Sequence, residues 1–350
     1  MEYAVWPQVG GDLSSARRHA ASFLDNLPVE KDYIAIGRQD WIAKWTTIGD
    51  HHCLLGESSI KNGAFDEATE AWLCALTAFE VARRLVDEDD TRRADLSTKV
   101  VMGIQRLKSS LLRQIEQVKI APCDLAELLA YYLPAGDSDA PAPAIICISM
   151  ENETGATLLG RLLPVVVGRG MSVLVISHDD ISHQSSSQSA ALLSCCLDYL
   201  LARPDVDGTR IGVFGEGLSA ALATDLAASD RSVAAAVCDG GLWNWVRTRA
   251  GIRWITRAVD GAVEHDAISA CRAQLTCPAL VVAGGRGIVS LSEAIQLQAD
   301  CIAAGADLDL AVPRIIRCSG GEIENFITSD DSIFGWLEHK LSSASAIGKV

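Results

Sequence analysis

The sequence is short of basic residues and lacks the segments that mark secreted or membrane proteins. Its 350 residues include 30 lysines and arginines against 45 aspartates and glutamates, which gives a net charge of −15 at pH 7. Such a charge repels nucleic acids and anionic membranes, so we expect neither as a partner. No basic-then-apolar segment opens the chain and no apolar run reaches the length of a membrane span, which indicates a cytoplasmic protein.

The eleven cysteines form no C-x-x-C pair. Most lie inside apolar runs, as Cys147, Cys238 and Cys277 do. Buried, reduced thiols are typical of the cytosol and argue against a disulfide framework. We expect no cofactor and no metal ion, because the histidines and acids occur at spacings that fit a metal site only weakly.

What the sequence does contain is a change of hydrophobic period near residue 118. Before it the pattern is helical, for instance with Trp72, Leu76 and Phe79 on one face. After it, short apolar strands alternate with helices, the pattern of a parallel sheet covered on both faces. We therefore predict an α/β protein: an N-terminal helical domain over residues 1–118, and a doubly wound, mostly parallel sheet over residues 119–350.

The helical domain is predicted to end with the helix Asp95–Val118. The predicted strands of the second domain are Ala126–Leu133, Ala144–Ser149, Ser172–Ile176, Ile211–Phe214, Val233–Cys238, Ala279–Ala283 and Arg314–Cys318.

The stretch Thr209–Ala223 looks like a nucleophile elbow that has lost its nucleophile. In the G-x-S-x-G motif of α/β-hydrolases, a tight strand-to-helix turn lifts a serine above the sheet. Here Gly217 stands at the serine position, and Ser219 stands where the closing glycine belongs. A register with Ser219 as nucleophile puts it two residues into the helix, pointing away from the turn. A serine in the first turn of a helix is the simpler interpretation.

The order of these segments resembles that of the FrsA-like α/β-hydrolases, which include dihydroxypseudooxynicotine hydrolases and fungal polyketide-shortening hydrolases. The resemblance covers the chain from about residue 40 to its end. It rests on Trp41–Trp45, Gly63–Arg84, Leu128–Pro143, Ile211–Ala223 and Cys277–Ala294. It implies an α/β-hydrolase fold with a serine at the elbow, an acid after the strand near Val282 and a histidine after the strand near Cys318.

The sequence departs from that family at all three catalytic positions. Gly217 replaces the serine, and Gly287 occupies the acid position within Gly284–Ser290. Ile323 fills the histidine position within Gly320–Phe326. A serine alcohol is a weak nucleophile without a base, and that base needs an acid to hold its tautomer. We therefore predict a degenerate triad that cannot form an acyl-enzyme.

Other groups near the elbow could still support catalysis. Backbone amides at Leu218 and after Ser149 could form an oxyanion hole at a helix N-terminus. Glu216, Asp239 and His178 are the candidate catalytic acids and bases. Further candidates are Glu322, Glu324 and His183.

Two segments are open to more than one interpretation. The loop Ser177–His183 places two histidines beside Asp179 and Asp180, which fits a proton relay, although a solvated polar loop is the simpler interpretation. A lid-like segment at about 240–275 contains candidate substrate-binding residues. These are Trp243, Trp245, Arg247 and Trp254. Indole and guanidinium groups suit a flat, oxygen-rich or anionic ligand, yet an amphipathic helix with its tryptophans on the core explains the pattern equally well.

Three functions remain open from the sequence. The first is an enzyme that uses acid–base chemistry for cyclisation, isomerisation or C–C bond cleavage in secondary metabolism. The second is a non-catalytic ligand-binding or scaffolding protein, and the third is a hydrolase with a relocated nucleophile such as Ser219. The resemblance implies an aromatic or polyketide-like small molecule as the substrate, and the chain could form a homodimer.

Overall fold

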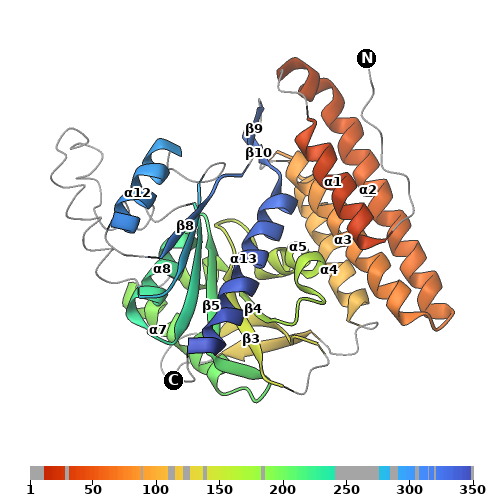
Figure 1. The fold of residues 1–350 in the computed structure, drawn as a ribbon. Coiled ribbons are helices and arrows are strands. Elements are labelled where there is room, and N and C mark those ends of the chain that lie inside the picture. The colour runs from red at the N-terminus through yellow and green to blue at the C-terminus, as the bar shows by residue number, and fades with distance from the viewer. Residues whose placement is uncertain are drawn as a thin grey trace. The chain divides into compact units, whose positions relative to one another are not determined.

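The computed structural model describes residues 12–27, 31–87, 90–108, 115–120, 127–136, 140–182, 186–240, 276–283, 291–303, 307–313, 315–318 and 321–347. The chain forms two compact units (Figure 1). The first consists of Met1–Ile115, Ala156–Val167 and Arg314–Asp331, and the second of Glu116–Gly155, Gly168–Pro313 and Ser332–Val350. Across these described ranges, no helix has both the length and the apolar character needed to cross a membrane.

Among the described residues, an eight-stranded sheet forms the centre of the second unit. Its strands lie in the order β1-β2-β4-β3-β5-β6-β7-β8. Strand β2 pairs antiparallel with both β1 and β4, and all the other pairs are parallel. The strands are β1 (Glu116–Ile120), β2 (Leu128–Leu133), β3 (Ala142–Ile148), β4 (Ser172–Ile176), β5 (Val206–Glu216), β6 (Val233–Asp239), β7 (Ala279–Val282) and β8 (Leu308–Ala311).

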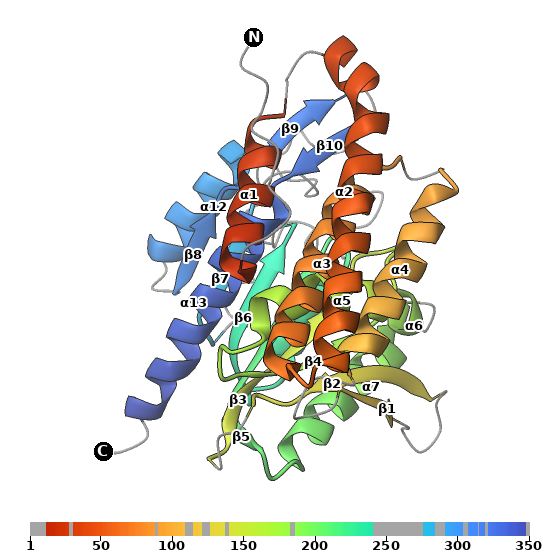
Figure 2. The same ribbon diagram turned by 90° about the vertical axis from the view of Figure 1, so that its right-hand side faces the viewer.

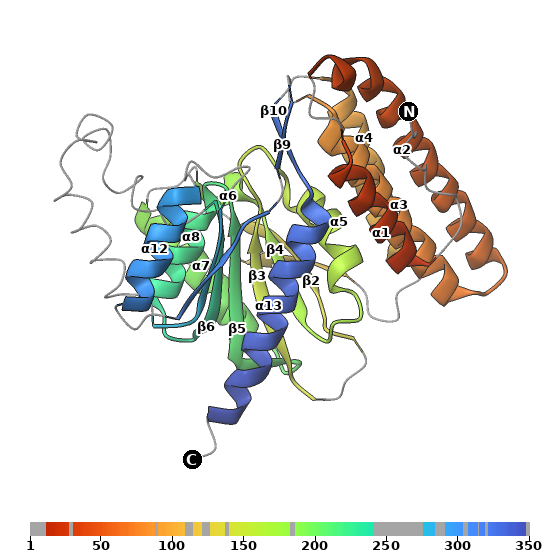
Figure 3. The ribbon, with the colours of Figure 1, turned by 45° about the horizontal axis from the view of Figure 1, so that its top comes forward.

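Helices cover both faces of this sheet, as its continuous apolar strands require. Alternate residues of β3 and β5, such as Ile146 and Val213, form one core with α7 (Ser186–Leu201) and α8 (Ser219–Ser229). On the opposite face, the ring of Phe214 lies 6.2 Å from that of Phe334 in α13 (Phe326–Ile347). Figure 3 shows these helices on opposite sides of the strands. Burial of each such side chain contributes about 1.5–3 kcal/mol, so these apolar runs account for the sheet.

The first unit is mainly helical (Figure 2). It contains α1 (Leu13–Asp25), α2 (Lys31–Lys61), α3 (Phe65–Leu85), α4 (Arg92–Leu107), nearly all of α5 (Gly155–Val166), the start of α13, and a hairpin of β9 (Ile315–Cys318) and β10 (Gly321–Glu324). Helix α3 is its most buried element, because almost every side chain from Ala71 to Leu85 is shielded from solvent. An alanine-rich helix with Trp72 and Phe79 can pack closely against several neighbours at once.

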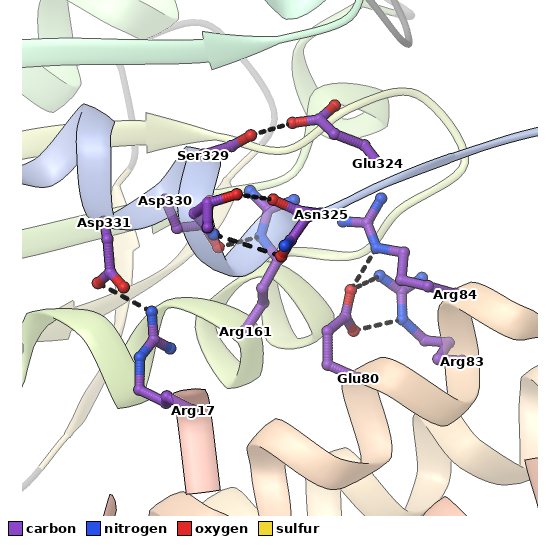
Figure 4. Close-up of polar contacts among 11 residues, drawn as sticks. Arg17, Glu80, Arg83, Arg84, Arg161, Glu324, Asn325, Ser329, Asp330 and Asp331 are labelled. Atoms are coloured by element: carbon purple, nitrogen blue, oxygen red, sulfur yellow. Dashed lines mark hydrogen bonds and ion pairs between the residues drawn. The ribbon is translucent and has the colours of Figure 1, made fainter. Parts of the chain in front are cut away.

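Charged side chains are buried in the first unit around Glu80 of α3 (Figure 4). Its carboxylate accepts hydrogen bonds from Arg83 Nε at 2.7 Å, Arg83 Nη2 at 2.9 Å and Arg84 Nε at 2.5 Å. Burial alone would raise the pKa of Glu80, but the charges of Arg83 and Arg84 outweigh that effect and lower the pKa to about 2. The carboxylate therefore stays ionised inside the unit.

The same region joins segments that are far apart in the sequence. Arg17 of α1 donates to Asp331 of α13 at 2.9 Å, across 314 positions of the chain. Arg161 of α5 lies 3.4 Å from the carboxylate of Asp330. Burial raises the pKa of Asp330 to about 6, because the lowering effects of Arg161 and Arg17 only partly offset it. The last part of the chain thus completes the helical unit through ionic contacts (Figure 4).

The structure corrects several sequence-based boundaries. The predicted helix Asp95–Val118 is wrong at its C-terminal end, because α4 ends at Leu107 and the alternating residues of β1 begin at Glu116. Strand β9 pairs with β10 and not with the main sheet, and β8 was not predicted at all. The segment expected as a loop at Ser177–His183 contains a short helix, α6 (His178–Ser182). The division into domains at residues 118 and 119 remains a proposal, since the compact units are not consecutive stretches of chain.

Candidate functional site

The elbow turn between β5 and α8 is present, with glycine at its tip. Gly217 has φ of +62°, in the left-handed region that side chains rarely adopt. A Cβ on Gly215 would lie 2.1 Å from the carbonyl oxygen of Ser219, so only glycine allows the helix to start this close to the strand. The Gly217 amide donates to the carbonyl oxygen of Asp239 at 2.8 Å, which fixes the turn to β6. The backbone has the form of a nucleophile elbow, but no side chain projects from its tip.

A carboxylate from another turn occupies the space beside this tip. Glu151 follows β3, and its Oε2 accepts a hydrogen bond from the Leu218 amide at 3.0 Å. A Cβ built on Gly217 would lie 2.5 Å from Glu151 Oε2, a distance that real atoms do not tolerate. The Glu151 carboxylate therefore fills the space into which a side chain at position 217 would extend.

Three buried polar residues form a hydrogen-bonded group beside the elbow. Ser219 Oγ donates to the carbonyl oxygen of Ser149 at 2.6 Å and lies 2.7 Å from His178 Nδ1. The His178 amide donates to Ser149 Oγ at 3.0 Å, and that hydroxyl donates to the carbonyl oxygen of Glu153 at 2.6 Å. Ser149 and Ser219 are fully buried, and His178 is 6% exposed. The group links the ends of β3 and β4 to the first turn of α8.

The direction of these hydrogen bonds follows from the chemistry of the acceptors. A carbonyl oxygen can only accept, so the Ser219 proton points to Ser149. Ser219 Oγ must then accept from His178, which assigns the imidazole proton to Nδ1. A serine nucleophile needs the opposite arrangement, in which the imidazole accepts the hydroxyl proton. The two residues are those of a catalytic dyad, but the hydrogen bond between them runs from the imidazole to the hydroxyl instead of from the hydroxyl to the imidazole.

Glu216 and Asp239 lie side by side at the carboxyl ends of neighbouring strands. They are register partners in the parallel pair β5–β6, and they are 2% and 5% exposed. Alternation along β5 places Glu216 on the face of Phe214, which α13 covers. Sequence reasoning grouped Glu216, Asp239 and His178 together; the structure pairs the two carboxylates and joins His178 to Ser149 and Ser219.

Several predicted site residues belong to segments that the structure does not describe. The substrate-binding candidates Trp243, Trp245, Arg247 and Trp254, the acid position within Gly284–Ser290, and His183 all lie outside the described residues. Ile323 and Glu324 lie in β10 of the first unit, where Ser329 donates to the Glu324 carboxylate. Within the described ranges, no group of three or more His, Cys, Asp or Glu residues could hold a metal ion.

Sequence reasoning missed Glu151. The available signal was an acid three residues after the end of the apolar strand β3, in the loop that was expected to supply an oxyanion-hole amide. Its position depends on Asn152, whose φ of +62° turns the chain sharply. Asparagine tolerates this conformation better than most residues, but the turn itself cannot be derived from one sequence.

Comparisons with known proteins find similarity among solved structures. No family model and no curated protein sequence matches the chain. Among solved structures, a 2,6-dihydroxy-pseudo-oxynicotine hydrolase is similar, with a TM-score of 0.58 and 19% identity over 92% of this chain and 95% of that one. AbyA5 has a TM-score of 0.49 and 17% identity over 87% and 84% of the two chains. An acylaminoacyl peptidase of Pyrococcus horikoshii has a TM-score of 0.46 and 12% identity over 65% of this chain and 42% of that one.

The sheet order, the elbow and the first of these likenesses together define an α/β-hydrolase fold. The resemblance drawn from the sequence, to a group that includes dihydroxypseudooxynicotine hydrolases, is confirmed at the level of the fold. One scaffold supports many reactions, so the activity has to be argued from the site.

Proposed function

We propose that this protein is an enzyme that uses acid–base chemistry, without an acyl-enzyme, on its α/β-hydrolase scaffold. The observation that supports this most directly is the tip of the elbow, where Gly217 offers no nucleophile and a carboxylate fills the space. The proposed reactions are cyclisation, isomerisation or C–C bond cleavage of an aromatic or polyketide-like metabolite. Each of these needs a proton to be removed and returned, which carboxylates and imidazoles can do.

Buried carboxylates support the proposal. Glu216 and Asp239 are almost fully shielded at the ends of β5 and β6, where α/β folds place their ligand-binding groups. His178 is held rigidly by its backbone and ring contacts with Ser149 and Ser219. We assign Glu216 and Asp239 to proton transfer or storage and His178 to positioning within the site.

The geometry opposes a hydrolase that uses Ser219. Its hydroxyl is fully buried, and its proton is committed to the Ser149 carbonyl. A nucleophile must reach the substrate and lose its proton to a base in hydrogen-bond reach. Ser219 meets neither requirement. We further propose a cytoplasmic location and a homodimer. Light scattering of the purified protein would test the dimer.

Two measurements test the function. The purified protein is treated with a fluorophosphonate probe and analysed by mass spectrometry, and no covalent adduct is expected. It is then incubated with nitrobenzisoxazole, a flat aromatic molecule that opens to a coloured phenolate when a base removes its C–H proton. Turnover above that of an equal concentration of acetate is expected.

Each outcome has a meaning. An adduct on Ser219 would establish the relocated nucleophile and refute the proposal. Absence of both the adduct and turnover would also refute it and would favour a ligand-binding protein, which a rise in melting temperature with a panel of aromatic metabolites would reveal.

A further inference from the structure

Glu151 is anchored at the elbow tip by one of its two carboxylate oxygens. Oε2 accepts from the Leu218 amide, across 67 positions of the chain. Leu218 is the N-cap of α8 and has no side-chain capping bond of its own, so this distant carboxylate takes that role. An anion is favoured there by the dipole of the helix N-terminus.

The second oxygen is available for another contact. In the described part of the chain, the bond to Leu218 is the hydrogen bond that Glu151 makes. Its side chain is partly exposed, and the neighbouring Leu218 side chain is 41% exposed. Because the Leu218 amide holds Oε2, the orientation of the whole carboxylate is fixed. Its other oxygen, Oε1, can therefore accept a proton from one defined direction.

The missing Cβ of Gly217 and the position of Glu151 are complementary. Any side chain at 217 would require the carboxylate to move, since the Cβ would lie 2.5 Å from Oε2, 3.3 Å from Cδ and 3.4 Å from Oε1. The backbone of Asn152, at φ +62°, is a further constrained residue next to the carboxylate. Constrained backbone of this kind is found where a side chain must be aimed.

We infer that Glu151 is the catalytic base of this site, in the place that a serine nucleophile would take. This inference rests on the proposed acid–base function and names the residue that performs it. The Oε1 oxygen removes a proton from a carbon of the ligand, the C–H electron pair remains on the ligand, and the resulting acid returns its proton to another atom of the same ligand or to its leaving group. No oxidant or second substrate is needed.

The same geometry defines the class of ligand. While Glu151 holds the Leu218 amide, that donor is not available to an oxyanion, and a ligand carboxylate would be repelled. The site therefore takes neutral or cationic molecules that carry an acidic C–H bond. Glu216 and Asp239 are less suited to this first contact because they are only 2% and 5% exposed.

The test compares variants in the nitrobenzisoxazole reaction. Glu151→Gln keeps the shape and an acceptor oxygen for the Leu218 amide but cannot take a proton. We expect its kcat to fall about 100-fold or more, with KM within about threefold of the wild-type value. Asp198→Asn, which removes an exposed carboxylate on α7, is the matched control and is expected to retain full activity.

The outcomes separate the two proposals. If the wild-type protein turns the probe over and Glu151→Gln retains at least half of its kcat, the assignment to Glu151 is wrong while the acid–base function stands. If Glu216→Gln alone abolishes turnover, the base is Glu216. If the wild-type protein shows no turnover, both proposals fail. A matching melting temperature for Glu151→Gln shows that any loss is not caused by unfolding.

Discussion

His178 Nδ1 donates to Ser219 Oγ over 2.7 Å, while the Ser219 proton is held by the carbonyl oxygen of Ser149. Residue identity alone suggests a serine–histidine dyad at the carboxyl edge of the sheet. The acceptor chemistry shows a structural connection instead, because neither group is placed to activate the other. Distances between a serine and a histidine identify a dyad only when the destination of each proton is also known.

The first prediction concerns this connection. Ser219→Ala is expected to lower the free energy of unfolding by about 1–3 kcal/mol, because it leaves the buried Ser149 carbonyl without its hydroxyl partner. Urea denaturation at pH 7 measures the change. Ser229→Ala, at the exposed end of the same helix, is the control and is expected to change stability by less than about 0.5 kcal/mol. Equal effects of the two substitutions would contradict the buried network.

The second prediction concerns the elbow tip. Gly217→Ser restores a serine but forces a Cβ against Glu151 at φ +62°, and we expect a loss of about 2 kcal/mol or more. Gly170→Ser has φ of +68° and open space around its Cβ, so it reports the backbone strain without the contact.

Glu151→Ala should relieve the contact at residue 217. In a double-mutant cycle with Gly217→Ser, we expect a favourable coupling of about 0.5–3 kcal/mol in the free energy of unfolding. Strict additivity would mean that the two positions do not share space.

The third prediction concerns pH and stability in the helical unit. The pKa of Asp330 rises from 3.8 to about 6 on folding, so the native state holds more protons than the unfolded state within that range. The free energy of unfolding contributed by Asp330 is therefore fully present below about pH 4 and is lost as pH rises through 6, a change of about 3 kcal/mol.

Asp330→Asn removes this proton uptake. The measured quantity is the free energy of unfolding of the variant minus that of wild type. This difference is expected to become about 3 kcal/mol more favourable to the variant between pH 4 and pH 7, whatever its value at pH 4. Guanidinium denaturation at each pH measures it. Asp331→Asn serves as the control, because that carboxylate is 46% exposed and remains solvated. Parallel pH profiles for wild type and Asp330→Asn would disprove the prediction.

The fourth prediction concerns the thiols. Burial raises the pKa of Cys74 and of Cys238 to about 12 in each case, so almost no thiolate exists at neutral pH. Iodoacetamide at pH 8 is expected to leave both unmodified in the native protein and to modify the partly exposed Cys195 before either of them. Peptide mass spectrometry gives the order of modification. Early labelling of Cys238 would show that the sheet opens near β6.

The sequence was sufficient for strands β2 to β7 of the central sheet because the information that defines them is local, whereas β1 was assigned to a helix and β8 was missed. Ser172–Ile176 was predicted with its observed bounds, since five consecutive buried residues define a parallel strand without reference to other segments. The glycine at position 217 was likewise identified from its motif. By contrast, the predicted strand Arg314–Cys318 was counted with the main sheet and β10 was not predicted, because periodicity does not specify which strands pair.

The site was harder to predict than the fold. His178 was a catalytic candidate in a segment interpreted either as a proton relay or as a solvated loop. It is buried, because its amide and ring find partners in Ser149 and Ser219. Glu151 carries no motif, and only the turn at Asn152 brings it to the elbow. The position of a proton and the direction of a carboxylate depend on contacts between distant segments. The elbow was therefore found from its local motif, and Glu151, which lies beside its tip, was not.

The ion pair between Arg17 and Asp331 has a consequence for biosynthesis. Helix α1 leaves the ribosome long before Asp331 is made, so the helical unit cannot complete its contacts until translation has passed residue 331. Until then the buried guanidinium groups of its interior lack some of their counter-charges. A fragment that stops at residue 118 should therefore be prone to aggregation in the cell, even though most of its helices are complete.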